Sequence, residues 1–166
     1  VNFAAKCYYR WGIPVPVVFR GPSGGGFRGG PYHSQNPEAW FTHVAGLKVV
    51  QPSTPYEAKG LLIAAIRENN PVIYLEHKHL YRRIREEVPD EDFEIPIGVA
   101  DVKRDGTDLT IVTYGAMVHT CLGVAERLVD GVTEGVRVDV GVPVDVEVVV
   151  RVPFSLTPLD PERFPR

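Results

Sequence analysis

Short apolar runs alternate with helical patterns along the first 80 residues. Three runs are largely apolar, which is typical of strands buried on both faces of a parallel sheet: 15–19, 48–50 and 72–75. Residues 54–57 (Thr-Pro-Tyr-Glu) form a capping box with proline at the first helical position, and apolar residues follow at helical spacing. A weaker signal at 36–38 predicts another helix with Asn36 as its cap. This alternation predicts a parallel sheet with right-handed crossovers, as in a partial doubly wound α/β lobe.

A charged stretch separates this lobe from a second one. Residues 81–98 carry many charges and two prolines, so we expect an exposed linker there. Beyond it, residues 108–113 predict a strand and residues 117–128 a helix with one apolar face. The valine-rich stretch 132–152 alternates with charged residues and predicts one or two half-buried strands.

The expected organisation therefore has three parts. A first α/β lobe covers residues 1–80, the linker covers 81–98, and the start of a second α/β lobe covers 99–166. We expect this second lobe to be incomplete, because the chain stops before such a domain would close.

Composition excludes several classes of protein. The chain has 166 residues, 44% of them hydrophobic and 23% charged, as in ordinary globular proteins. Its formal net charge is −3 and its basic residues are scattered, so we expect no nucleic-acid partner. We expect no membrane partner either, because no stretch approaches the roughly 18 apolar residues that a spanning helix needs. Cys7 and Cys121 lack disulfide-framework or metal-ligand spacing, which favours a reducing compartment. Val1-Asn2 resembles neither a start methionine nor a signal peptide, so we expect the natural N-terminus upstream.

The glycine-rich segment 20–30 is the densest local feature. Its G-x-G-x-x-G pattern at 24–29 matches a dinucleotide-binding fingerprint formally, but Pro31 follows where a helix should begin. The sequence contains no Gly-Lys-Ser/Thr, which argues against a P-loop. Residues 21–25 also fit a Gly-x-Ser-x-Gly nucleophile elbow, although the glycines after Ser23 disfavour the required helix. From the pattern alone, a flexible surface or interface loop is favoured over a ligand-binding loop.

His33 follows this segment and is the best single candidate for chemistry. An imidazole titrates near neutral pH and transfers protons readily, whereas the alternative is a histidine hydrogen-bonded within the loop. His77 and His79 could bind a metal, but without a third ligand in spacing we expect them on the solvated surface. Residues 67–71 (Arg-Glu-Asn-Asn-Pro) close the helix that starts at 54–57, and carbonyls freed at such an end could hold a hard cation.

Several longer motifs occur in a fixed order along the chain. They are 20–24 (Arg-Gly-Pro-Ser-Gly), 32–41 with its Tyr-His-Ser-Gln start, 43–50 (ending Gly-Leu-Lys-Val-Val), 53–55, 58–62, 65–72, 80–81, 95–98 and 110–115. Together they resemble the β subunit of the thiamine-diphosphate-dependent 2-oxo acid dehydrogenases of the pyruvate and branched-chain type. The resemblance covers residues 1–130.

The resemblance implies a fold and an activity. The first lobe would be the later part of a transketolase-like pyrimidine-binding domain, and the second would be the start of a transketolase C-terminal-like domain. Such a subunit decarboxylates a 2-oxo acid with thiamine diphosphate and transfers the acyl group to a lipoyl group on the acyltransferase core. Its implied partner is an α subunit in a heterotetramer, and that subunit would hold most of the cofactor and its magnesium.

The resemblance also implies residue roles. His33 matches the active-site histidine of the family's His-Ser-Gln motif. A potassium site would take carbonyls from Val17, Ala65 and Ile66 and side chains from Glu68 and Asn70, with Glu68 standing where aspartate is more usual. The glutamate that activates the cofactor is expected upstream of Val1, so the isolated chain should be inactive.

Alternatives remain open at this stage. An acetoin dehydrogenase subunit shares the motifs, and a transketolase or deoxyxylulose-phosphate synthase relative shares the lobes. A non-catalytic dinucleotide-binding or scaffold module is the alternative from a different class. For the dehydrogenase, the expected compartment is the cytoplasm if the source is prokaryotic and the mitochondrial matrix if it is eukaryotic.

Overall fold

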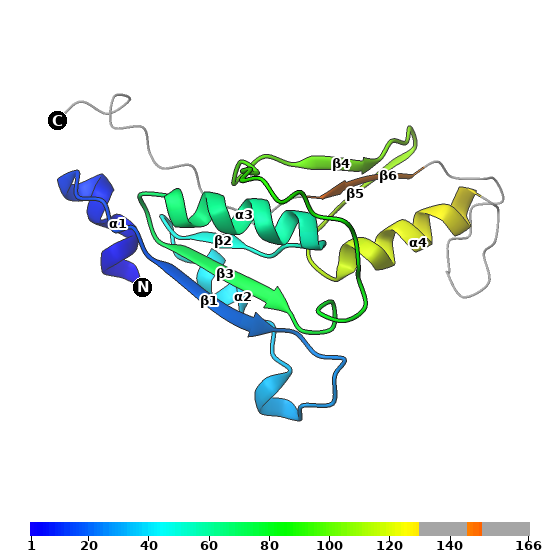
Figure 1. The fold of residues 1–166 in the computed structure, drawn as a ribbon, viewed down its shortest axis with the longest axis horizontal. Helices are drawn as coiled ribbons and strands as arrows, with labels where there is room; N and C mark the ends of the chain where they lie inside the picture. The colour runs from blue at the N-terminus through cyan, green and yellow to red at the C-terminus, as the bar shows by residue number, and fades with distance from the viewer. Residues whose placement is uncertain (130–145, 151–166) are drawn as a thin grey trace.

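The computed structural model describes residues 1–129 and 146–150, which form two three-stranded sheets with flanking helices (Figure 1). The first sheet has the strand order β1 (Val18–Ser23), β3 (Val72–His77), β2 (Lys48–Val50). Both neighbours run parallel to the central strand β3. The predicted α/β class with a parallel sheet is therefore confirmed.

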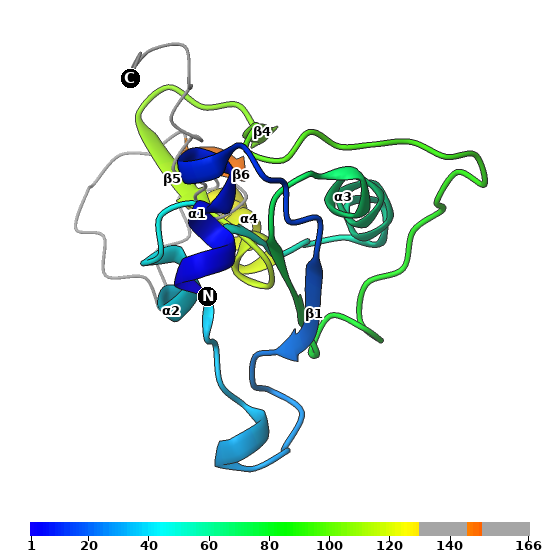
Figure 2. The ribbon, with the colours of Figure 1, turned by 90° about the vertical axis from the view of Figure 1, so that its left-hand side faces the viewer.

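Helices cover both faces of this sheet: α1 (Asn2–Trp11), α2 (Glu38–Thr42) and α3 (Pro55–Arg67). Figure 2 shows α3 on one side of the sheet, with α1 and α2 on the other. Val72 and Tyr74 of β3 pack with the α3 face, while Ile73 and Leu75 pack with the opposite face. Because successive strand residues point to opposite faces, burial on both sides explains why β3 is a continuous apolar run.

Local signals explain where these helices begin. The Thr54 hydroxyl accepts a hydrogen bond from the Glu57 N–H (3.2 Å), which is half of the predicted capping box. The Glu57 carboxylate instead accepts from the N–H and the hydroxyl of Ser53, both at 2.7 Å. The predicted cap at Asn36 is wrong, because α2 follows Pro37 without any side-chain cap. Strand β1 starts three residues later than the apolar run at 15–19 suggested.

The second sheet has the order β4 (Asp101–Arg104), β6 (Val146–Val150), β5 (Leu109–Thr113). Strand β6 runs antiparallel to β4 and parallel to β5. Helix α4 (Met117–Val129) packs against this sheet through a small cluster around Ala125 and Leu128. Of the valine-rich stretch, β6 is a strand as predicted, and the rest of 132–152 lies outside the described residues.

The linker has no helix or strand between β3 and β4, and most of its residues are exposed as predicted, but some of its apolar residues pack against α3. The Phe93 ring stacks on Tyr56 of α3, with ring centroids 4.4 Å apart. The Ile95 N–H donates to the Gly60 carbonyl (3.2 Å), and a Cβ on Gly60 would lie 2.6 Å from the Phe93 ring. The apolar residues of a charged segment therefore hold it against α3.

Specific polar contacts join the two lobes. Lys103 of β4 forms an ion pair with Glu57 of α3, with 2.8 Å between Nζ and Oε1. His119 of α4 lies with Nε2 2.8 Å from the Ser53 carbonyl, a distance at which the ring N–H donates. None of the helices in the described part of the chain is long and apolar enough to cross a bilayer.

Candidate active site

The segment 24–37, which we call the His33 loop, joins β1 to α2 and projects from the sheet beyond the end of β1 (Figure 1). Strand β1 is parallel to β3, so the loop leaves from the carboxyl edge of the sheet. Open α/β sheets bind ligands at this edge. The position therefore makes the loop a candidate for function, beyond the surface connection that its glycines alone suggest.

Two imidazole rings pack against the glycines of the His33 loop. Gly24 has φ +78°, and a Cβ there would lie 2.1 Å from Nε2 of His77. Gly26 has φ +83°, and a Cβ there would lie 2.7 Å from Nδ1 of His79. The expectation that both histidines are solvated surface is wrong, since each is only half-exposed and packs under the loop. The glycines thus serve close packing as well as backbone freedom.

The ends of the loop are tied together at its neck. The Gly24 N–H donates to the Gln35 carbonyl (2.8 Å). Beneath this bond, the Gln51 amide donates from Nε2 to the Ser23 hydroxyl (3.0 Å) and to the Glu38 carboxylate (2.9 Å). All three side chains are buried. Sequence reasoning missed this trio, because its members lie on three separate elements and no short motif joins them.

The Ser23 contact also excludes the nucleophile-elbow alternative. Ser23 is 1% exposed, its hydroxyl accepts from Gln51, and glycine-rich loop follows it in place of a helix. A nucleophilic serine in that motif stands exposed on a strand-to-helix turn. Ser23 is therefore part of the loop anchor.

His33 is the last residue of a short 3-10 helix (Pro31–His33) at the outer part of the loop. Its ring is exposed, and no hydrogen-bond partner for it occurs among the described residues. The neighbouring Tyr32 side chain is 86% exposed. The His33 imidazole is therefore solvent-exposed on a loop whose two ends are held together. The alternative, a histidine hydrogen-bonded within its own loop, is not what the structure shows.

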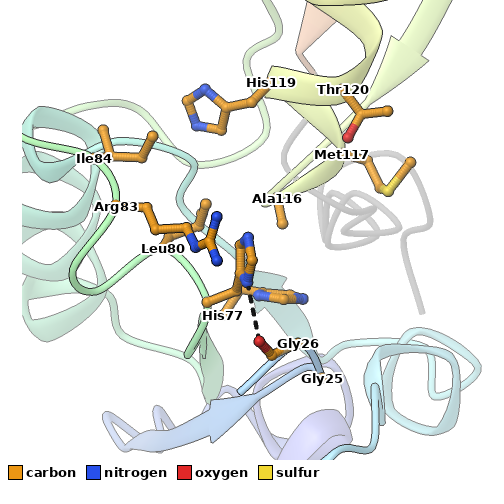
Figure 3. Close-up of a pocket in the computed structure, with 11 residues that line it drawn as sticks. Gly25, Gly26, His77, Leu80, Arg83, Ile84, Ala116, Met117, His119 and Thr120 are labelled. Atoms are coloured by element: carbon orange, nitrogen blue, oxygen red, sulfur yellow. Dashed lines mark hydrogen bonds between the residues drawn. The ribbon is translucent and has the colours of Figure 1, made fainter. Parts of the chain in front are cut away.

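A cavity of about 410 Å³ lies between the His33 loop, the end of β3 and the start of α4 (Figure 3). Gly26, His77, Arg83 and His119 are among its lining residues, but His33 is not. Burial lowers the pKa of His77, the neighbouring His79 lowers it further, and Glu38 opposes the shift. The Nδ1 atom of His77 is buried without a hydrogen-bond partner among the described residues.

A second polar cluster lies on the same edge of the sheet. Arg20 of β1 pairs with Glu76 of β3 (2.8 Å), and the Tyr81 hydroxyl donates to the same carboxylate (2.8 Å). Burial, followed by the contact with Glu76, raises the pKa of Tyr81 to about 12. The phenol therefore stays protonated at neutral pH and acts as a hydrogen-bond donor.

The residues predicted for potassium gather where α3 ends and the first sheet begins. The Val17 carbonyl accepts from the Val72 N–H (2.9 Å), and the Ala65 carbonyl accepts from the Glu68 N–H (3.4 Å). The Glu68 carboxylate forms an ion pair with Lys48. Burial raises the pKa of Glu68, but Lys48 and the Asn70 N–H outweigh burial and lower it overall. The Glu68 side chain is thus already neutralised by an ammonium group.

The fold and the loop geometry first define a class: an α/β domain followed by the start of a second one. The family described as transketolase, pyrimidine binding domain, matches residues 2–84, and the transketolase C-terminal domain family matches residues 98–160. The chain belongs to the transketolase pyrimidine-binding domain family and continues into the C-terminal domain family.

Curated relatives define the resemblance more closely. The chain is 50% identical over 157 residues to the 2-oxoisovalerate dehydrogenase subunit beta of Bacillus subtilis, covering 90% of this chain and 47% of that protein. It is 50% identical over 143 residues to the pyruvate dehydrogenase E1 component subunit beta of the same organism, covering 85% and 43%. The predicted resemblance to the β subunits of 2-oxo acid dehydrogenases is confirmed, and the chain spans less than half the length of these relatives.

Two further similarities are to another β subunit and to a solved structure. The chain is 49% identical over 153 residues to the acetoin:2,6-dichlorophenolindophenol oxidoreductase subunit beta of Cupriavidus necator, covering 90% of this chain and 45% of that protein. Among solved structures, a split-gene transketolase described as an inactive β4 tetramer matches with a TM-score of 0.61 and 23% identity. That match covers 97% of this chain and 50% of the other, and it supports the fold alone.

Proposed function

We propose that this chain is part of the β subunit of a thiamine-diphosphate-dependent 2-oxo acid dehydrogenase. The enzyme would decarboxylate a 2-oxo acid and pass the acyl group to a lipoyl group on an acyltransferase core. The sequence supports this proposal, because the chain is 50% identical to two such β subunits over at least 85% of its length. The structural observation that carries the proposal is the exposed His33 imidazole on a loop anchored at the carboxyl edge of the sheet.

His33 is the catalytic residue in this proposal. When bound, thiamine diphosphate supplies the electron sink for decarboxylation. The protein residues then have to position the substrate and move protons. An exposed imidazole on a fixed loop suits proton transfer, because it can reach a reacting atom on a docking partner and can donate or accept a proton there.

Other subunits complete the proposed site. Among the described residues, no group of three or more His, Cys, Asp or Glu side chains is placed to hold a metal ion. In line with the resemblance to the β subunits, the proposal assigns magnesium and most of the diphosphate contacts to an α subunit in a heterotetramer. The exposed Tyr32 (86%) and Trp40 (72%), which flank His33 in the sequence, suit contact with that partner.

The substrate is a 2-oxo acid, and the pyruvate and branched-chain types are supported equally by the identities. An acetoin-cleaving subunit is the second candidate, favoured by the 49% identity to the acetoin oxidoreductase subunit. Activity of the assembled enzyme with pyruvate, 2-oxoisovalerate and acetoin separates the three. The proposed compartment is the cytoplasm in a prokaryote and the mitochondrial matrix in a eukaryote.

Substitution of His33 tests the proposal. In the full-length β subunit assembled with its α subunit, His33→Ala should reduce kcat by about 100-fold or more, the usual contribution of a general acid or base. Assembly should be intact, because the ring is exposed and forms no hydrogen bond with any residue that the structure describes. His43→Ala is the matched control, since His43 is an exposed histidine of the same lobe beside α2. An unchanged kcat in His33→Ala would remove the catalytic role.

We also propose a potassium ion at the end of α3, held by the carbonyls of Val17, Ala65 and Ile66. The Ile66 carbonyl lies in the last turn of α3, where helix carbonyls lack intrahelical partners. The Val17 and Ala65 carbonyls each accept one backbone hydrogen bond and keep a second lone pair for a hard cation. Asn70 would add its side-chain oxygen. The Glu68 carboxylate would have to serve Lys48 and the ion together, so the carbonyl oxygens carry most of the proposed coordination.

A further inference from the structure

One buried amide touches both ends of the His33 loop. Ser23 is the last residue of β1, Glu38 is the first residue of α2, and Gln51 directly follows β2. The Gln51 NH₂ group has two protons, and they are directed to the Ser23 hydroxyl at 3.0 Å and the Glu38 carboxylate at 2.9 Å. The three side chains are 1%, 4% and 5% exposed for Ser23, Gln51 and Glu38, so water competes little for these bonds.

The second lobe holds this amide from the other side. Gly115, in the turn between β5 and α4, has φ +55°. A Cβ at Gly115 would lie 2.9 Å from both Cδ and Oε1 of Gln51. The backbone of the turn therefore packs directly on the amide. Gln51 is confined between the neck of the loop and the second lobe, which fixes the direction of its two N–H bonds.

Stability alone does not account for this arrangement. Apolar side chains of matching shape often stabilise a buried site as well as hydrogen-bonded polar groups do. Val49 and Val50, which precede Gln51, are both fully buried in the two apolar clusters of the lobe. What a directional amide adds is a set separation between the start and the end of the loop, because both bonds have narrow distance and angle ranges.

We propose that Gln51 is a positioning residue for His33. By joining Ser23 to Glu38, its amide sets the width of the loop neck, and the backbone bond from Gly24 to Gln35 transmits that width to the outer loop. This inference rests on the proposed function of His33. Loss of the amide leaves the imidazole chemically intact but displaced, so its effect should appear in kcat through His33.

The test uses full-length β subunit assembled with its α subunit and assayed with a 2-oxo acid. Gln51→Leu should lower kcat per assembled enzyme by about 10- to 100-fold, because a misplacement of about 1 Å costs up to about 100-fold. In a His33→Ala background, Gln51→Leu should cause no further loss, because both changes act on the same group. Thr54→Ala is the control: it removes the cap of α3 and should lower Tm without changing kcat.

A polarity swap keeps the test decisive if Gln51→Leu does not assemble. Gln51→Glu places two carboxylates together and should lower kcat strongly. Adding Glu38→Gln restores one donor and one acceptor, and the Ser23 hydroxyl can reverse its role, so the double variant should recover most of the lost kcat. Recovery supports the proposal.

Four outcomes overturn the proposal, and they separate it from the function of His33. If His33→Ala lowers kcat but Gln51→Leu does not, the positioning role is wrong while the catalytic role stands. The same conclusion follows if the losses multiply in the double variant, or if the polarity swap recovers nothing. If His33→Ala itself leaves kcat unchanged, both proposals are wrong.

Discussion

Gly24→Ala tests whether the His33 loop is held by packing on His77. Alanine at a positive φ costs about 1–2 kcal/mol, because its Cβ crowds the following carbonyl. A Cβ at Gly24 would also lie 2.1 to 2.5 Å from three atoms of the His77 ring, closer than real contacts allow. Overpacking of this kind typically costs a further 1–3 kcal/mol, so we expect a total loss of about 2–5 kcal/mol.

Gly12→Ala separates the two contributions. Gly12 ends α1 with φ 66° and ψ 18°, in the left-handed region. Apart from its two chain neighbours, no atom of the described residues lies within 4 Å of a Cβ built there. Its substitution should therefore cost only the backbone part, about 1–2 kcal/mol. In a His77→Ala background, the free-energy cost of Gly24→Ala should fall to the same value, because the ring that causes the clash is gone.

Urea titration of the assembled full-length enzyme, at constant protein concentration, provides the measurement. Hydrogen exchange at the Gly24 N–H, which donates to Gln35, reports the loop locally. If Gly24→Ala costs no more than Gly12→Ala, or costs the same with and without the His77 ring, then the ring does not support the loop.

Three further predictions follow from single contacts. Burial raises the pKa of Glu57, but hydrogen bonds from Lys103 and Ser53 outweigh it and lower the pKa overall. The stabilisation that ionised Glu57 contributes to the folded state is complete above the ordinary pKa range of a carboxyl group. It is lost as the pH falls through the lower pKa that Glu57 has in the folded state, so the Tm difference between wild type and Glu57→Gln should shrink on acidification. Tyr74→Phe removes the 2.7 Å bond from a buried hydroxyl to the Ala58 carbonyl and should cost about 0.5–1.5 kcal/mol, measured by urea unfolding. Potassium should raise the Tm of the assembled enzyme more than sodium does at equal ionic strength, and equal effects would remove the proposed cation site.

Local chemistry made part of the fold predictable from the residues. Thr54 and Pro55 specify the start of α3 within one turn, and the uninterrupted apolar run of β3 reports burial on both faces. Strand β4 escaped prediction because its four residues, Asp101–Arg104, are short and mostly polar, and its pairing partner β6 lies more than 40 residues away. Helix α1 escaped it because only Ala5 and Cys7 are buried, so its apolar face is narrow.

The candidate site also has one part that the sequence shows and another that only the folded structure decides. His33 and its loop are visible in the sequence, since a motif is a local pattern. The supports of the loop come from residues that are distant in the chain: His77 at the end of β3, His79 just after it, Gln51 after β2, and Gly115 before α4. Parallel strands bring His77, His79 and Gln51 to one edge of the first sheet, the second lobe adds Gly115, and only the folded chain sets their contacts. Hydrogen bonds and close packing depend on distances of a few tenths of an ångström, which a one-dimensional pattern does not encode.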